Sequence, residues 1–236
     1  MPNWVKNTIC IKGDEAQILS FINMGLVGSK LAAATDVAEG FDRLVTNGCN
    51  KTSKMSKNGN VRVVYNKGLT MRSFFPMPTT FLLYDTTNYA NKYPKAAKYQ
   101  KDKYGVVGWY DYNLKTLGCK WDAELENPSL SVAKVSKKYV VSFEVETPWS
   151  YPQLWMEQIE SKTGCEVYIA SIEESDMWLF WSRLGGDEHS YLPQLEEKAR
   201  ELGDNYDELF EYRYTLYGCA VNACVCTATE HLTEYI

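Results

Sequence analysis

The chain opens with an alternating pattern, in which the apolar residues Val5, Ile9 and Ile11 are separated by polar ones. A period of two is typical of a β-strand with one apolar face. Similar patterns predict strands at 62–65, 167–172 and 177–181. They also predict a half-exposed antiparallel hairpin, with arms at 130–132 and 141–146 on either side of a turn at 136–138.

Two helices have clear start signals. Asp14 and Gln17 have the spacing of a capping box, which predicts a helix just after the first strand. Ser150 and Gln153 predict a second helix in the same way, and Gly164 is its expected end. The residues expected to face the interior from these helices are Ile18, Phe21, Ile22, Leu154, Trp155 and Ile159.

Other segments have weaker patterns. Residues 31–36 favour a short helix, and a basic helix is expected after Pro94. The stretch 74–78 contains two prolines and predicts an extended apolar anchor. Pro193 opens an acidic helix that ends at Gly203, whereas the spacing over 204–217 fits a helix and a strand equally well.

The order of these elements predicts a fold. Without a long insertion at about 29–108, the order is β-α-β-β-α-β. That order predicts an α+β, ferredoxin-like antiparallel sheet with helices on one face. Residues 1–185 would form this domain with its basic insertion, and 186–236 would form an acidic, mainly helical C-terminal extension.

Charge is distributed very unevenly along the chain, whose net charge is −5. Residues 43–103 carry twelve Lys or Arg and two acidic residues, whereas residues 104–236 carry ten basic and twenty-three acidic residues. A basic block inside an acidic protein indicates a local field directed at an anion or an acidic partner.

Composition narrows the class of protein. Hydrophobic residues make up 45% and charged residues 23%, which is ordinary for a globular chain. The sequence contains no apolar run of about 18 residues, the length that would predict a membrane span. The N-terminal residues form no apolar signal core, so a location in the cytoplasm of a host cell is expected. The seven cysteines include no Cys-x-x-Cys and are expected to be free thiols, Cys219, Cys224 and Cys226 among them.

Motifs of catalysis are missing from the sequence. It contains no phosphate-binding glycine loop, nucleophile elbow or zinc-protease motif, and His189 and His231 are far apart. Glu144 and Glu146 share one strand face, where a solvated surface is the expectation. We therefore expect no catalytic residue, metal or cofactor, and an enzyme such as a nuclease or phosphodiesterase is the least favoured alternative.

The candidate binding residues lie in and after the basic block. Lys120 next to Trp121, near Trp109, suits a nucleotide, because rings stack on bases and an ammonium neutralises phosphate. Lysines spaced three apart after Pro94 extend the surface. Alternatively, the two tryptophans are structural and the lysines only solvated. The predicted ligand-binding residues are Arg72, Lys95, Lys98, Tyr99, Trp109, Asn113, Lys120 and Trp121.

Four landmarks resemble the YubB-type, Api-like ferredoxin-domain family of phages and plasmids. They are 2–13 (Pro-Asn-Trp-Val, then Asn7, Ile9, Ile11 and Gly13), 74–78 (Phe-Phe-Pro-Met-Pro), Trp109 with 117–123 (Leu-Gly-Cys-Lys-Trp-Asp-Ala), and 143–152 (Phe-Glu-Val-Glu-Thr-Pro-Trp-Ser-Tyr-Pro). Leu117 stands where the family has Trp, Cys119 where it has Thr, and Tyr151 where it has Pro. The resemblance covers most of residues 1–185 and implies a ferredoxin-like fold and a mobile-element origin, but no reaction.

Two functions follow as hypotheses. The first is a non-enzymatic phage or mobile-element protein that captures a phosphate-bearing ligand, either a nucleotide signal or single-stranded nucleic acid, in counter-defence against the host. Long duplexes are disfavoured as partners, because the overall charge is negative. The alternative is an inhibitor or assembly module that binds a host protein through its charged surfaces. Exposed sheet edges would allow a homo-oligomer.

Overall fold

The computed structural model describes residues 3–26, 33–47, 49–55, 61–82, 91, 93–175 and 178–230. The chain divides into two compact units. The sheet unit comprises Met1–Ile18, Leu125–Tyr151 and Met156–Ile236, and the insertion unit comprises Leu19–Glu124 and Pro152–Trp155. No helix among these described residues is long and apolar enough to cross a bilayer.

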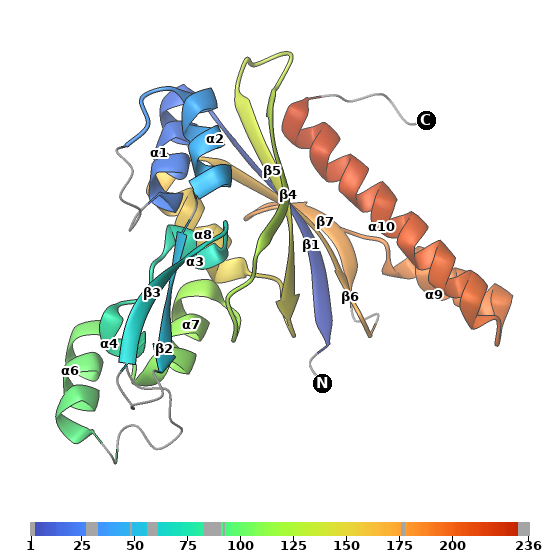
Figure 1. The fold of residues 1–236 in the computed structure, drawn as a ribbon. Helices are drawn as coiled ribbons and strands as arrows, with labels where there is room; N and C mark the ends of the chain where they lie inside the picture. Colours follow the sequence, from blue (N-terminus) through green and yellow to red (C-terminus); the bar gives the residue numbers. More distant parts are fainter. Residues whose placement is uncertain are drawn as a thin grey trace. The chain divides into compact units, whose positions relative to one another are not determined.

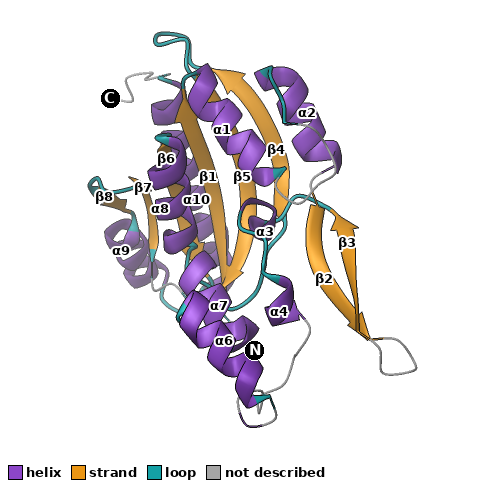
Figure 2. Cartoon of the chain, turned by 90° about the vertical axis from the view of Figure 1, so that its left-hand side faces the viewer, coloured by secondary structure: helices purple, strands orange, loops and turns teal. Residues whose placement is uncertain are grey.

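The sheet unit contains a six-stranded antiparallel sheet (Figure 2). Its strands lie in the order β4 (Leu125–Val132), β5 (Tyr139–Pro148), β1 (Trp4–Gly13), β6 (Glu166–Glu173), β7 (Leu179–Arg183) and β8 (Glu188–Ser190). The four strands β4, β5, β1 and β6 have the order of a split β-α-β arrangement, with β1 between β5 and β6. The predicted α+β, ferredoxin-like class is therefore confirmed, and β7 and β8 extend the sheet beyond β6.

The start signal of the first core helix is confirmed, and the second core helix lies where the sequence predicts it. Helix α1 (Glu15–Gly25) begins with a reciprocal capping box, in which Asp14 and Gln17 each accept the other's main-chain N–H at 2.9 Å. Helix α8 (Gln153–Thr163) is followed by Gly164, whose φ of 69° is a left-handed C-terminal conformation. Within α8, Trp155 and Ile159 are buried as predicted. Leu154 is 39% exposed, because the interior-facing side of the helix falls on Trp155, Met156 and Ile159 instead.

The C-terminal part consists of α9 (Leu192–Leu202) and the long α10 (Tyr206–Thr229). The ambiguous segment 204–217 is therefore helical from Tyr206. Helix α10 lies across one face of the sheet (Figure 1), and the part of α8 in this unit lies on the opposite face. The small buried residues Ala220, Cys224 and Ala228 of α10 allow this helix to approach the strands closely.

The helix α10 covers the polar side of β1. Thr8, Cys10 and Lys12 alternate with the apolar residues of this strand, yet each of the three is at most 7% exposed. Each has a polar contact or a small neighbour on α10 or on Glu230, the residue that follows it. Thr8 Oγ1 lies 3.2 Å from Tyr217 Oη, and Cys10 packs in the cluster with Ala220 and Cys224. From Asn7 to Gly13 the strand is consequently buried on both of its faces.

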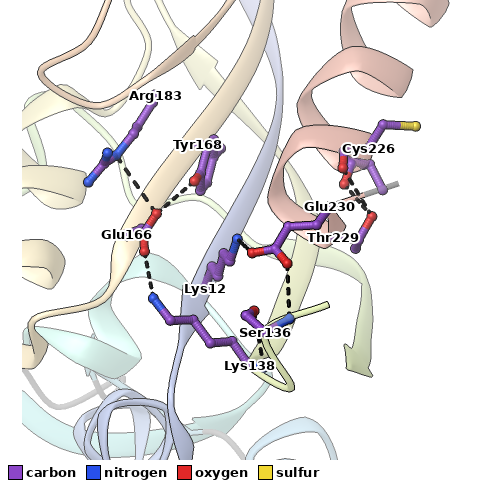
Figure 3. A network of polar contacts seen from close by, with 10 residues as sticks. Lys12, Ser136, Lys138, Glu166, Tyr168, Arg183, Cys226, Thr229 and Glu230 are labelled. Carbon is purple, nitrogen blue, oxygen red and sulfur yellow. Dashed lines mark hydrogen bonds and ion pairs between the residues drawn. The ribbon is translucent and has the colours of Figure 1, made fainter. Parts of the chain in front are cut away.

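A polar network holds the end of α10 to the sheet (Figure 3). Lys12 Nζ donates to Glu230 Oε1 at 2.6 Å, and the main-chain N–H of Ser136 donates to Glu230 Oε2 at 3.0 Å. Beside it, Lys138 and Tyr168 both donate to Glu166, each at 2.8 Å. Burial opposes ionisation of Glu166, but these hydrogen bonds outweigh it and lower its pKa.

The insertion unit contains short elements. They are α2 (Val37–Asn47), the hairpin β2 (Cys49–Met55) and β3 (Val61–Lys67), α3 (Met71–Phe74), α4 (Thr79–Leu82), α6 (Pro94–Tyr104) and α7 (Gly108–Leu117). The strand predicted at 62–65 and the helix predicted after Pro94 are confirmed. The helix expected at 31–36 is not present over 33–36, since α2 begins at Val37, and residues 31–32 lie outside the described part.

Aromatic residues form the interior of the insertion unit. The ring of Phe74 stacks on Phe21 at 4.7 Å between centroids and meets Trp155 edge-on at 5.4 Å. The indole N–H of Trp155 donates to the main-chain oxygen of Met71 at 3.1 Å. Phe74, Phe75 and Met77 are all buried. The stretch 74–78 therefore acts as the apolar anchor that its sequence predicts, with Phe74 as the last residue of α3 and the rest non-helical.

Candidate ligand-binding site

The candidate site is built on α7 and the loop that follows it in the insertion unit. Helix α7 ends at Gly118, whose φ of 79° places the cap in the left-handed region that glycine adopts easily. The loop that follows, 118–122, brings Lys120 into contact with Tyr110 and Asn113 of α7. A residue from the start of α7 and residues from the loop after its end therefore lie at one surface.

The side chain of Lys120 lies between two aromatic rings. Its Nζ is 5.7 Å from the ring centroid of Tyr110 and 4.9 Å from that of Trp121. Both separations fall within the range of a cation–π interaction. Tyr110 is 44% exposed, and Lys120 and Trp121 are half-buried. The three residues therefore present flat aromatic surface and a positive charge to solvent at the same place.

A buried amide fixes the loop from below. Asn113 is 1% exposed, and its Nδ2 donates to the main-chain oxygen of Lys120 at 2.7 Å. Its Oδ1 accepts a hydrogen bond from Arg72 Nη2 at 2.9 Å. The main-chain N–H of Arg72 donates in turn to Asp122 Oδ1 at 3.0 Å. These bonds connect α3, α7 and the loop, and they set the position of Lys120 and Trp121.

Burial governs the ionisation of this supporting layer. Desolvation lowers the pKa of Arg72, and the nearby carboxylate of Asp122 counteracts that effect. Desolvation raises the pKa of Asp122, and Arg72 counteracts it in the same way. Burial also raises the pKa of the Cys119 thiol to about 12. Asn113 and Arg72 are both predicted ligand-binding residues. Asn113 is buried and contacts Lys120 directly, whereas Arg72 is half-buried and contacts Asn113 and Asp122.

The predicted residues of α6 lie on an exposed basic helix. Lys95, Lys98 and Tyr99 are exposed, whereas Ala97 and Gln100 face the interior. Tyr99 Oη accepts a hydrogen bond from Lys103 Nζ at 2.9 Å, and this bond lowers the pKa of Tyr99. Lysines and an aromatic ring therefore occur together on this helix, as they do around Lys120.

The structure places Trp109 against apolar residues and its neighbour Tyr110 beside Lys120. Trp109 is half-buried and packs on the cluster of Met77, Phe81 and Leu82. Tyr110, which is not among the predicted ligand-binding residues, has its ring beside the ammonium of Lys120. The sequence feature that could have identified Tyr110 is its spacing of three from Asn113. This spacing places both residues on one side of a helix once α7 is recognised.

Several basic residues of the block cannot be assigned to this surface. Arg62 and the lysines of the β2–β3 hairpin have side chains outside the described part, as has Lys92. In the sheet unit, the ring of His189 stacks on Trp181 at 4.3 Å, and His231 is outside the described residues. Glu144 and Glu146 are exposed. Within the described part, no three His, Cys, Asp or Glu side chains gather as a metal site would require.

Comparison with known proteins identifies no family for this chain. No family model matches the chain, and the comparison with curated proteins gives no match. Among solved structures, the chain is similar to the protein api92 from Yersinia pseudotuberculosis, with 11% sequence identity and a TM-score of 0.33. The similarity covers 81% of this chain and 98% of that one. The fold described above rests on strand order and register alone.

Proposed function

We propose that the chain is a non-enzymatic binding protein of a phage or mobile element, of the Api-like type. Its insertion unit would capture a phosphate-bearing ligand, either a nucleotide signal or single-stranded nucleic acid, in counter-defence. The observation that supports this proposal is the ammonium of Lys120 held between the rings of Tyr110 and Trp121. Stacking on a base and neutralisation of a phosphate need those two elements side by side.

The electrostatics of the surroundings support an anionic ligand. The insertion unit carries the exposed lysines of α6, Lys95 and Lys98 among them. Arg72 adds a positive charge beneath the Lys120 loop, in contact with Asn113. A ligand with a planar base and a phosphate would meet the aromatic surface and this positive field together.

The test is a binding titration with mononucleotides, cyclic dinucleotides and short single-stranded oligonucleotides. We expect saturable binding whose affinity falls between about 50 and 200 mM salt, because phosphate contacts release counterions. Trp121→Ala should weaken binding by about 1–3 kcal/mol through lost stacking, and Lys120→Gln should reduce the salt dependence. Lys134→Gln makes the same charge change on an exposed residue of the sheet unit and should leave binding unchanged. Equal losses in Lys120→Gln and Lys134→Gln, or no salt-sensitive binding by any ligand, would refute the proposal.

A second function is favoured by the exposed side of α10. Tyr206, Phe210 and Tyr214 follow one another at spacings of four and are 72%, 56% and 41% exposed. Acidic residues surround them, including Asp207, Glu208 and Glu211. An aromatic stripe with an acidic border suits docking to a basic host protein. A stoichiometric host partner that binds the wild type and is lost in Phe210→Glu would move the assignment to a protein inhibitor.

A further inference from the structure

The sheet unit contains a recess of about 220 Å³ near the first residues of β1. A recess of this volume holds several waters or a small organic molecule. It is lined by Trp4, Lys6, Glu146, Ile172, Glu174, Arg213 and Tyr214. None of these residues belongs to the candidate site described above, which lies in the insertion unit.

Strand register places the floor of the recess. Lys6 of β1 is paired with Glu146 of β5 on one side and with Ile172 of β6 on the other. The three residues therefore form a row across adjacent strands, and Trp4 lies two residues along β1 on the same face. Glu174 follows β6, and its Oε2 accepts the main-chain N–H of Trp4 at 2.9 Å.

Helix α10 forms the opposite wall. Toward its C-terminal end, the small residues Ala220 and Cys224 let the helix approach the sheet closely. Nearer its start, the larger Arg213 and Tyr214 stand at the recess. Arg213 is 7% exposed and donates from Nη2 to the main-chain oxygen of Glu173. The recess thus lies where α10 changes from small to large residues along its length.

The charges of the recess are of both signs. Arg213 and Lys6 are cationic, and both approach the ring of Tyr214, each at 5.9 Å from its centroid. Glu146 and Glu174 are anionic. Lys6 Nζ is 3.9 Å from Glu146 Oε1, and their side chains are 46% and 53% exposed. An exposed pair at that distance is weak, so both groups can exchange it for bonds to a ligand.

We propose that this recess binds a small zwitterion, namely an α-amino acid with a flat apolar side chain. The ligand carboxylate meets Arg213 and Lys6, and its ammonium meets Glu146 and Glu174. The side chain lies against Trp4 and Tyr214, over Ile172. A simple anion would face the two glutamates without compensation, and a simple cation would face Lys6 and Arg213 in the same way.

The experiment compares three probes of nearly equal shape by calorimetric titration and by NMR shifts of the indole N–H signals. They are L-tryptophan, tryptamine, which lacks the carboxylate, and indole-3-propionate, which lacks the ammonium. We expect L-tryptophan to bind saturably and each analogue to bind about tenfold or more weakly, since each loses charge-assisted hydrogen bonds.

Variants assign each end of the ligand. Glu146→Gln should weaken the binding of L-tryptophan and leave the binding of indole-3-propionate unchanged. Lys6→Gln should weaken the binding of L-tryptophan and leave the binding of tryptamine unchanged. Both side chains are about half exposed, so the fold should persist. Glu144→Gln, two residues away on the same exposed strand face, is the matched control. The proposal is overturned if L-tryptophan shows no saturable binding, or if either analogue binds the wild type as tightly as L-tryptophan does.

Discussion

The ammonium of Lys12 donates a 2.6 Å hydrogen bond to the carboxylate of Glu230 and thereby joins β1 to the residue that follows α10 (Figure 3). The Lys12 side chain is 6% exposed, whereas that of Glu230 is 28% exposed. Because an unpaired buried ammonium is costly, this carboxylate stabilises the packing of α10 over the polar side of β1.

Glu230→Gln should destabilise the sheet unit at neutral pH, because Lys12 then lacks an anionic partner. Urea denaturation, followed by circular dichroism, should show a lower midpoint than the wild type. The exposed pair of Lys198 and Glu201 on α9 provides the control. Glu201→Gln removes a carboxylate of the same type from a solvated pair and should leave the midpoint nearly unchanged. Equal effects of the two substitutions would contradict this prediction.

The contribution of Glu230 should depend on pH. The hydrogen bond from Lys12 lowers the pKa of Glu230 in the folded protein. A lowered pKa means that the stabilisation is fully present above the pKa of the unfolded chain and disappears as pH falls through the folded-state pKa. The difference in unfolding free energy between wild type and Glu230→Gln should therefore be largest at neutral pH and shrink on acidification below about pH 4. A difference that is constant with pH would assign the effect to packing.

Ala220→Leu should push α10 away from the sheet. Ala220 is fully buried in the cluster that contains Cys10 and Cys224, so added methylene groups have no free volume. Overpacking of this kind costs about 1–3 kcal/mol of unfolding free energy. Cys219→Leu, at the exposed neighbouring position, should cost much less. Chemical denaturation of both variants under the same conditions measures the difference.

Asn113→Ala should both destabilise the insertion unit and loosen the loop of Lys120. The substitution leaves the main-chain oxygen of Lys120 and a guanidinium N–H of Arg72 without their amide partner. A buried polar group left unsatisfied costs about 1–3 kcal/mol. Hydrogen exchange should show faster exchange at 119–122 than in the wild type. Leu114→Ala, at an exposed position of the same helix, should leave that exchange rate unchanged.

The thiols should differ in reactivity according to burial. Burial raises the pKa of Cys119 to about 12 and that of Cys165 to about 11, so both remain protonated at pH 8. The thiol of Cys219 is exposed. Alkylation with iodoacetamide at pH 8, followed by peptide mass spectrometry, should modify Cys219 first and reach Cys119 and Cys165 only in urea. Early modification of Cys119 in the folded protein would show that its loop opens.

Local patterns in the sequence were enough to predict the framework. The period of two in 5–11 and the capping box of Asp14 and Gln17 depend on residues close together in the chain. These signals depend little on distant contacts, so the order of strands and helices followed from them. That order in turn restricted the sheet to few topologies, and the observed strand order is among them.

The tertiary structure decided what lies on each surface. Thr8, Cys10 and Lys12 read as a polar strand face, and only the docking of α10, more than two hundred residues later, buries them. Similarly, Lys120 lies beside Tyr110, which the sequence did not predict, and α4 and its neighbours take Trp109 into their apolar cluster. The physical reason is the same in both cases. Burial and pairing depend on residues distant in sequence, and local periodicity carries no information about which distant residue arrives.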